Sequence, residues 1–320
     1  MKILVTGCAG FIGYHLSLYL AKTKNNKIYG LDNINSYYDR KLKKDRIKNL
    51  IKNKNFIFYK LEISNKKKIN SLIKRTKITH VIHLAAQAGV RHSITHPEKY
   101  VKNNINGFFS ILDCCRLNDI KHLIFASTSS VYGNKKTFPV NEKFNTDKPL
   151  SFYAASKKSN EVMAYAYSNI YNLPCTALRF FTVYGSYGRP DMSLFKFTEA
   201  IVKSKKINLY NKGDHVRDFT YIDDVVKYTS KLVNKPSRKK IPYNCFNVGS
   251  DKPQRLKYFL KLIEQNLNKK TNFNLLPLQQ GDVQKTHADM TSIKNYLKIK
   301  YITDIKIGIK KFIKWYKAYY

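Results

Sequence analysis

Short apolar stretches alternate with segments of helical period through the first half of this 320-residue chain, and this alternation constrains the fold more than any other feature. Strands joined by helices in this way run parallel in one sheet, with helices covering both faces. The sequence therefore predicts an α/β fold with a doubly wound parallel sheet. The predicted strands are 2–6, 27–31, 56–60, 80–84, 122–126 and 175–180, and the predicted helices are 10–22, 43–53, 69–74, 98–117 and 152–171.

The pattern loosens after residue 182, where glycine and proline recur at short intervals. We expect residues 1–182 to form the sheet domain and residues 183–320 to form most of a smaller, irregular substrate-binding region. Apolar residues at 244–248 predict a late strand that returns to the sheet, so the two regions should be interleaved. Helical patterns at 193–204 and 305–320 predict two further helices.

Three glycines follow the first predicted strand, where a helix should begin. Gly7, Gly10 and Gly13 let the chain turn sharply and let a ligand approach the backbone. The N-terminus of the following helix would supply free N–H groups for a dinucleotide pyrophosphate. Asp32 lies nineteen residues after Gly13, at the end of the second strand, where a carboxylate can bind the adenosine ribose. Its charge would repel a 2′-phosphate, so the sequence favours NAD over NADP as cofactor.

Tyr153 and Lys157 are four residues apart in a predicted helix, so their side chains share one face. Because an ammonium group favours a nearby phenolate, we expect Lys157 to lower the pKa of Tyr153 into the range of a general base. Thr128 follows the fifth strand and could hydrogen-bond to the same substrate hydroxyl. A lone Tyr-x-x-x-Lys pair is more typical of an amphipathic helix with a solvated lysine. Together with the glycine loop and Asp32, the three residues predict a hydride-transfer site.

The composition narrows the possible partners. The chain carries 59 Lys and Arg residues against 21 Asp and Glu, a formal charge of +38. The excess is mostly lysine spread over the whole length, so we interpret it as solvated surface and expect no specific nucleic-acid site. No apolar run approaches the ~18 residues of a membrane span. The first strand begins at the second residue, which leaves no room for a signal peptide and favours the cytoplasm. The five cysteines have neither paired nor metal-ligand spacing, so we expect free thiols and no bound metal.

Further motifs accompany these residues: His83-Leu-Ala-Ala86, Val131-Tyr-Gly133 and Arg217-Asp-Phe-Thr-Tyr-Ile-Asp-Asp224. With the glycine loop and the tyrosine–lysine pair, they make nearly the full chain resemble the extended short-chain dehydrogenases/reductases that modify nucleotide sugars. Within that family the chain is most similar to UDP-glucuronate 4-epimerases, which share the stretch 32–39 and a form of the stretch 179–192. The resemblance implies a Rossmann fold, bound NAD and a UDP-sugar substrate.

The resemblance also implies a reaction and a set of site residues. Tyr153 would take the proton of the sugar 4-hydroxyl while C4 gives a hydride to NAD⁺, and the 4-keto sugar would turn over before the hydride returns. Dehydratases and decarboxylases of the family carry an acid just after the threonine, whereas this chain has Thr128-Ser129-Ser130, so an epimerase is favoured. The implied catalytic residues are Tyr153, Lys157 and Thr128. The implied cofactor-binding residues are Gly7, Gly10, Phe11, Ile12, Gly13, Asp32, Asn33, Glu62, Ile63, Leu84, Ala85, Ala86 and Lys157. The implied substrate-binding residues are Thr128, Ser129, Ser130, Tyr153, Thr182, Arg189, Arg217 and Asp282.

By the same resemblance, Arg189 would bind the carboxylate of a uronic acid and Thr182 would hydrogen-bond to the same end of the sugar. A carboxylate held by charge pairing would also protect the 4-keto intermediate, a β-keto acid, from losing CO₂. The alternatives for Arg189 are a surface loop residue or a diphosphate ligand.

Other positions are less determined. Arg217 should contact the UDP diphosphate, or else form an ion pair with Asp223 or Asp282. Arg91 could also face the sugar, but the sequence does not place it. Glu62 stands where relatives usually carry aspartate at the adenine end.

Two rival interpretations stay open. A neutral UDP-hexose 4-epimerase would share the catalytic residues without the carboxylate contact. A non-catalytic protein that binds dinucleotide or RNA would commonly have lost Tyr153 or Lys157, and this chain keeps both. The resemblance further implies a homodimer, in which helices 98–117 and 152–171 form a four-helix bundle with their copies.

Overall fold

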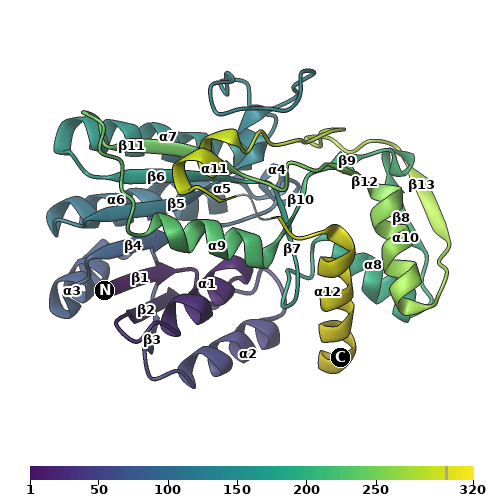
Figure 1. The fold of residues 1–320 in the computed structure, drawn as a ribbon, viewed down its shortest axis with the longest axis horizontal. Coiled ribbons are helices and arrows are strands. Elements are labelled where there is room, and N and C mark those ends of the chain that lie inside the picture. Colours follow the sequence, from purple (N-terminus) through teal and green to yellow (C-terminus); the bar gives the residue numbers. More distant parts are fainter. Residues whose placement is uncertain (300–301) are drawn as a thin grey trace.

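Seven parallel strands form one sheet at the centre of the protein (Figure 1). The computed structural model describes residues 1–299 and 302–320. The chain builds the sheet outward from β1 to one edge, then returns beside β1 and builds to the other edge, which confirms the doubly wound Rossmann fold. From edge to edge the strands are β11 (Tyr243–Val248), β6 (Cys175–Phe180), β5 (His122–Thr128), β4 (His80–His83), β1 (Lys2–Thr6), β2 (Lys27–Asp32) and β3 (Phe56–Lys60).

Helices cover both faces of the sheet because successive side chains of each strand point to opposite faces. In β1, Ile3 and Val5 belong to one apolar core and Leu4 belongs to the other. The first core is covered by α1 (Phe11–Ala21), α2 (Arg40–Ile51) and α9 (Ile222–Leu232). The second is covered by α3 (Lys66–Thr76), α6 (Gly107–Leu117) and α7 (Phe152–Tyr171). Both faces of the sheet are therefore buried. A ligand can reach the sheet only at the ends of its strands.

The predicted helix 98–117 is interrupted. After α4 (His92–Thr95) the structure has α5 (Pro97–Tyr100), then a π-helical turn η1 (Val101–Asn106), then α6. The extra residue of the π turn directs Asn104 inward, where its amide nitrogen donates to the Gln87 carbonyl and to Ser156 Oγ, both at 3.0 Å. The turn therefore ties the segment after β4 to the helix that carries Tyr153.

The second half of the chain contributes to both regions of the molecule. Helix α9 packs against α1, and strand β11 pairs with β6 at the edge of the sheet. The remaining elements form a smaller lobe beside the carboxyl ends of the strands, on the right of Figure 1. Its elements are β7 (Thr182–Tyr184), α8 (Ser193–Val202), β8 (Ile207–Tyr210), β9 (Val216–Arg217), β10 (Phe219–Tyr221), β12 (Gln254–Arg255), α10 (Leu256–Leu267), β13 (Phe273–Leu276), α12 (Ile305–Tyr319) and the short turn η3 (Asn211–Gly213). Helix α11 (Thr291–Leu297) packs against α9 and β11 of the sheet region, and the short turn η2 (Ser129–Tyr132) follows β5 and contacts α7. Within residues 1–299 and 302–320, no helix combines the length and apolar character needed to cross a bilayer.

Candidate active site

A cavity of about 1090 Å³ lies at the carboxyl ends of the sheet strands, against the smaller lobe. This volume exceeds the range of ~300–1,000 Å³ that is usual for one small ligand, so there is room for a dinucleotide and a second ligand together. With the exception of Glu62, every site residue predicted from the sequence lines it. These residues are Gly7, Gly10, Phe11, Ile12, Gly13, Asp32, Asn33, Ile63, Leu84, Ala85, Ala86, Thr128, Ser129, Ser130, Tyr153, Lys157, Thr182, Arg189, Arg217 and Asp282.

The glycine loop is shaped for a pyrophosphate. Helix α1 begins at Phe11, and its N-cap Gly10 offers no side chain to its first turn, so the N–H groups there remain open to a ligand. A Cβ on Gly13 would lie 2.1 Å from the Gly7 carbonyl oxygen, and a Cβ on Gly7 would lie 2.7 Å from the Ala85 nitrogen. Only glycine allows the helix, the loop and the end of β4 to pack this closely. The residues present therefore fit a dinucleotide such as NAD.

Asp32 ends β2 at the place where an adenosine ribose would lie. Its Oδ2 accepts from the Ala9 nitrogen at 3.0 Å and its Oδ1 from the Ile34 nitrogen at 2.8 Å. Burial raises the pKa of its carboxyl group, while the Ile34 hydrogen bond and the charge of Lys43 oppose that shift. Lys43 also lines the cavity, and burial lowers its pKa to about 8. The sequence did not single out Lys43, because it is one lysine in a lysine-rich helix.

Glu62 is the predicted cofactor-binding residue that lies outside the cavity lining. Its side chain is exposed and does not line the cavity. Both carboxylate oxygens instead accept hydrogen bonds from the Asn33 amide nitrogen, each at 3.1 Å. The neighbour Asn33 competes for this carboxylate, so the lining at this end comes from Asn33 and Ile63.

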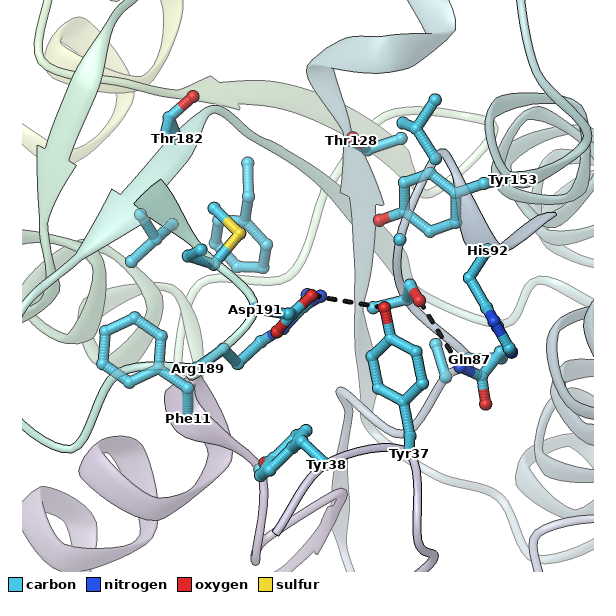
Figure 2. Close-up of a pocket in the computed structure, with 18 of the residues that line it drawn as sticks. Phe11, Tyr37, Tyr38, Gln87, His92, Thr128, Tyr153, Thr182, Arg189 and Asp191 are labelled. Atoms are coloured by element: carbon cyan, nitrogen blue, oxygen red, sulfur yellow. Dashed lines mark hydrogen bonds and ion pairs between the residues drawn. The ribbon is translucent and has the colours of Figure 1, made fainter. Parts of the chain in front are cut away.

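Helix α7 presents Tyr153 and Lys157 to the cavity, as the spacing predicted. Ser151 caps the N-terminus of this helix, because its Oγ accepts from the Ala154 nitrogen at 3.2 Å. Lys157 is 2% exposed, its Nζ donates to the Ala126 carbonyl at 2.9 Å, and burial lowers its pKa to about 8. Figure 2 shows Thr128 and Tyr153 side by side at one end of the cavity.

The expected lowering of the Tyr153 pKa by Lys157 is wrong for this structure. Burial raises the pKa of the phenol, and the influences that oppose this rise are the charge of Arg189 and a hydrogen bond with Thr128. The hydrogen bond that Lys157 Nζ makes in this structure is to the Ala126 carbonyl near the end of β5.

Arg189 enters the cavity from the loop before α8, opposite Tyr153 (Figure 2). It forms a bidentate ion pair with Asp191, with Nε to Oδ1 at 3.0 Å and Nη2 to Oδ2 at 2.5 Å. The Tyr37 hydroxyl donates to the same Asp191 Oδ2 at 3.2 Å. Asp191 and Tyr37 were not among the predicted site residues, although both lie in stretches that carried the family resemblance.

A second cationic cluster lies toward the smaller lobe. Arg217 Nη2 lies 2.8 Å from Asp282 Oδ1, which decides its ion-pair partner in favour of Asp282 over Asp223. Arg91 Nη2 lies 3.8 Å from the other oxygen of Asp282, with its guanidinium 4.8 Å from the centre of the Tyr210 ring. Two arginines therefore share one carboxylate at the cavity wall, an arrangement suited to a diphosphate.

A buried ion pair supports the catalytic wall from behind. Arg179 Nε and Nη2 donate to the two oxygens of Glu161 at 2.8 and 2.7 Å, and Ser127 Oγ donates to Glu161 Oε1 at 2.6 Å. Glu161 lies one turn after Lys157 on α7, so the contacts join α7, β5 and β6 immediately beneath Thr128. Sequence reasoning missed this pair, because its partners come from different elements.

Residues 3–249 match the model of the NAD dependent epimerase/dehydratase family. The chain belongs to this family. The family expected from the motifs and its dependence on NAD are thereby confirmed.

Individual relatives cover the whole chain. The chain is 46% identical to Protein CapI of Staphylococcus aureus, over 100% of this chain and 99% of that protein. It is 40% identical to UDP-glucuronate 4-epimerase 1 of Arabidopsis thaliana, over 100% of this chain and 77% of that protein. Its fold matches the UDP-glucuronic acid 4-epimerase from Bacillus cereus in complex with UDP-glucuronic acid and NAD, with a TM-score of 0.94, 32% identity and full coverage of both chains. It matches the UDP-glucose 4-epimerase of Thermotoga maritima with a TM-score of 0.88, 29% identity and 99% coverage of both.

Proposed function

We propose that this protein interconverts UDP-glucuronate and UDP-galacturonate by transient oxidation of the sugar at C4. The observation that carries the proposal is the position of Arg189 in the same cavity as Tyr153, close enough for its charge to act on the pKa of the phenol. A guanidinium at that place suits an acidic sugar better than a neutral one. The similarity to UDP-glucuronate 4-epimerases over the full chain supports the same substrate.

The roles of the catalytic residues follow from their contacts. Tyr153 accepts the proton of the sugar 4-hydroxyl, and Thr128 hydrogen-bonds to that phenol and holds the proton path in place. Lys157 keeps a buried cationic donor beside the end of β5. NAD⁺ held by the glycine loop and Asp32 would supply the hydride acceptor for C4 of the sugar. Between the two transfers the 4-keto sugar must present its other face, and Tyr153 then returns the proton to the oxygen.

The acidic residues of the cavity argue against elimination of water. Among the described residues that line it, the carboxylates are Asp32, Asp191 and Asp282. Asp32 accepts from two backbone N–H groups, Asp191 pairs with Arg189, and Asp282 pairs with Arg217. None of the three is a free acid beside Tyr153. This supports epimerisation over the dehydratase chemistry known in the family.

The test is incubation of the purified protein with UDP-glucuronate without added NAD⁺, followed by chromatography and proton NMR of the sugar nucleotides. We expect UDP-galacturonate to form, and we expect Tyr153→Phe to lower kcat by a factor of ~10²–10⁴. Arg189→Ala should raise KM for UDP-glucuronate more than for UDP-glucose. Faster conversion of UDP-glucose than of UDP-glucuronate by the unaltered protein would instead support a neutral hexose epimerase.

A homodimer and a cytoplasmic location complete the proposal. Helices α6 and α7 leave several large apolar side chains exposed, including Phe109, Val162, Tyr165 and Ile170, of which Ile170 is 64% exposed. Apolar side chains gathered on two neighbouring helices fit a four-helix bundle with a second copy. For the cytoplasm, the support is the cysteine pattern of the sequence.

A further inference from the structure

Asp191 places a carboxylate on the very guanidinium that is proposed to bind the sugar acid (Figure 2). The two side chains come from one loop, two positions apart, and both line the cavity. Their side chains are 21% and 29% exposed, so the ion pair is only partly shielded from water. Either Asp191 must leave before a uronate binds, or it has another purpose while it stays.

The geometry of the pair leaves Arg189 able to bind a second carboxylate. A guanidinium has five N–H donors in a rigid plane. Asp191 takes one from Nε and one from Nη2, along a single edge. The Tyr37 hydroxyl is a further hydrogen-bond partner of this guanidinium, which leaves two of the five donors. Because Arg189 lines the cavity, these remaining donors are available to a ligand while the ion pair with Asp191 persists.

Tyr37 fixes Asp191 from the other side. Its hydroxyl donates to Asp191 Oδ2 at 3.2 Å, and its ring centre lies 5.8 Å from the Arg189 guanidinium carbon. The hydroxyl packs directly on the backbone of Gly89, where a Cβ would approach it to 2.4 Å. Tyr37 follows β2, whereas Asp191 precedes α8, so the contact joins the cofactor side of the cavity to the loop that carries Arg189.

We propose that Asp191 and Tyr37 are positioning residues that hold the remaining donors of Arg189 toward the sugar and thereby set the preference for an acidic sugar over a neutral one. The inference rests on the proposed function for the identity of the sugar. A planar guanidinium binds a carboxylate most strongly when the orientation of the guanidinium is already fixed before binding. Without Asp191 the long Arg189 side chain would have to be ordered by the substrate itself.

The variant Asp191→Asn distinguishes this positioning role from the alternative, in which the Asp191 carboxylate competes with the substrate carboxylate for Arg189. The substitution keeps the shape of the side chain but removes its charge, which weakens the ion pair. If Asp191 positions Arg189, the variant should bind UDP-glucuronate less well. If Asp191 competes with the substrate, the variant should bind it better.

The experiment compares kcat and KM for UDP-glucuronate and UDP-glucose in the unaltered protein and in Asp191→Asn, Asp191→Glu and Tyr37→Phe, together with calorimetric binding of both ligands. We expect Asp191→Asn to lower kcat/KM for UDP-glucuronate roughly tenfold, mainly through KM, and to leave UDP-glucose within about twofold. Tyr37→Phe should have a smaller effect in the same direction, and Asp191→Glu should keep part of the preference. Asp119→Asn, an exposed carboxylate on the loop after α6, controls for the change in net charge.

Three outcomes would overturn the positioning role: tighter binding of UDP-glucuronate by Asp191→Asn, equal losses for both sugars, or no preference between the two ligands in the unaltered protein. Failure of the proposed function gives a different result. An unaltered protein that binds UDP-glucuronate preferentially but does not convert it refutes the epimerase, whereas the effect of Asp191→Asn on that binding still decides the positioning role.

Discussion

The guanidinium of Arg46 donates from Nη2 to the Tyr187 carbonyl at 2.6 Å and is completely buried. Its Nη1 donates to the Ala9 carbonyl in the glycine loop at 2.8 Å and to the Tyr38 hydroxyl at 2.6 Å. One side chain of α2 therefore joins the loop that would hold the pyrophosphate to the loop that leads to Arg189. Arg46 therefore links the proposed cofactor-binding loop to the loop that carries the proposed sugar-binding residue Arg189.

Substitution of Arg46 should loosen the loop around residues 186–191. A lysine ammonium is compact, whereas the guanidinium spreads its donors over a planar fork that reaches both loops. We therefore expect Arg46→Lys to lose the contact with one loop and about 2–3 kcal/mol in the free energy of unfolding. Faster amide hydrogen exchange in residues 186–191 would locate the effect. Lys44→Met, which alters an exposed lysine of the same helix, is the control. Unchanged exchange in that segment would show that Arg46 does not hold it.

The stability of the protein should depend on pH through Lys157. Its pKa falls from 10.5 in the unfolded chain to about 8 in the folded protein because of burial. Between these values the unfolded chain binds more protons, so the contribution of this group to stability rises with pH from 8 to 10.5. Below pH 8 the buried ammonium costs about 3 kcal/mol, and above pH 10.5 the cost is gone.

Denaturant unfolding at several pH values checks this. Relative to Lys157→Met, the unaltered protein should gain about 3 kcal/mol of unfolding free energy between pH 8 and 10.5. The adjacent Lys158→Met, which removes a partly exposed lysine, should show no such difference. A pH-independent gap between the unaltered protein and Lys157→Met would contradict the assigned pKa.

The ion pair of Glu161 and Arg179 should be sensitive to removal of one partner. Both side chains are nearly inaccessible, at 5% and 6%. Glu161→Gln leaves a buried guanidinium without its counter-charge, which should cost about 3–5 kcal/mol in unfolding free energy. The double substitution Glu161→Leu with Arg179→Met should be less destabilising than Glu161→Leu alone, because no charge then remains buried. Thermal unfolding of the set measures this, and additive losses would refute the coupling.

The exposed face of α6 and α7 should control assembly. Val162→Glu or Ile170→Glu would place a charge in the proposed apolar interface, and we expect each to raise the dimer dissociation constant at least tenfold, since burial of an unpaired charge costs on the order of several kcal/mol. Sedimentation velocity at several protein concentrations measures the dimer dissociation constant of each variant. Val202→Glu, at an exposed apolar position on α8, is the matched control. A monomeric unaltered protein would refute the dimer itself.

The features that the sequence determined are local ones. Alternating apolar runs defined the strands and helices, because burial on both faces of a parallel sheet requires continuous apolar strands. The spacing of Gly7, Gly10 and Gly13 fixed the turn into α1, and the four-residue interval placed Tyr153 and Lys157 on one face. Each of these depends on neighbours within a few residues, so the chain itself carries the information.

Only the tertiary structure decided the contacts between side chains and groups that are distant in the sequence. Asp191 accepts from Tyr37, Arg217 pairs with Asp282, Arg46 binds three backbone carbonyls, and Lys157 donates to the Ala126 carbonyl. Every residue offers the same backbone carbonyl, so no sequence pattern marks which one a buried cation will find. Charged side chains are abundant here, and only their distances in the folded protein determine which pairs form.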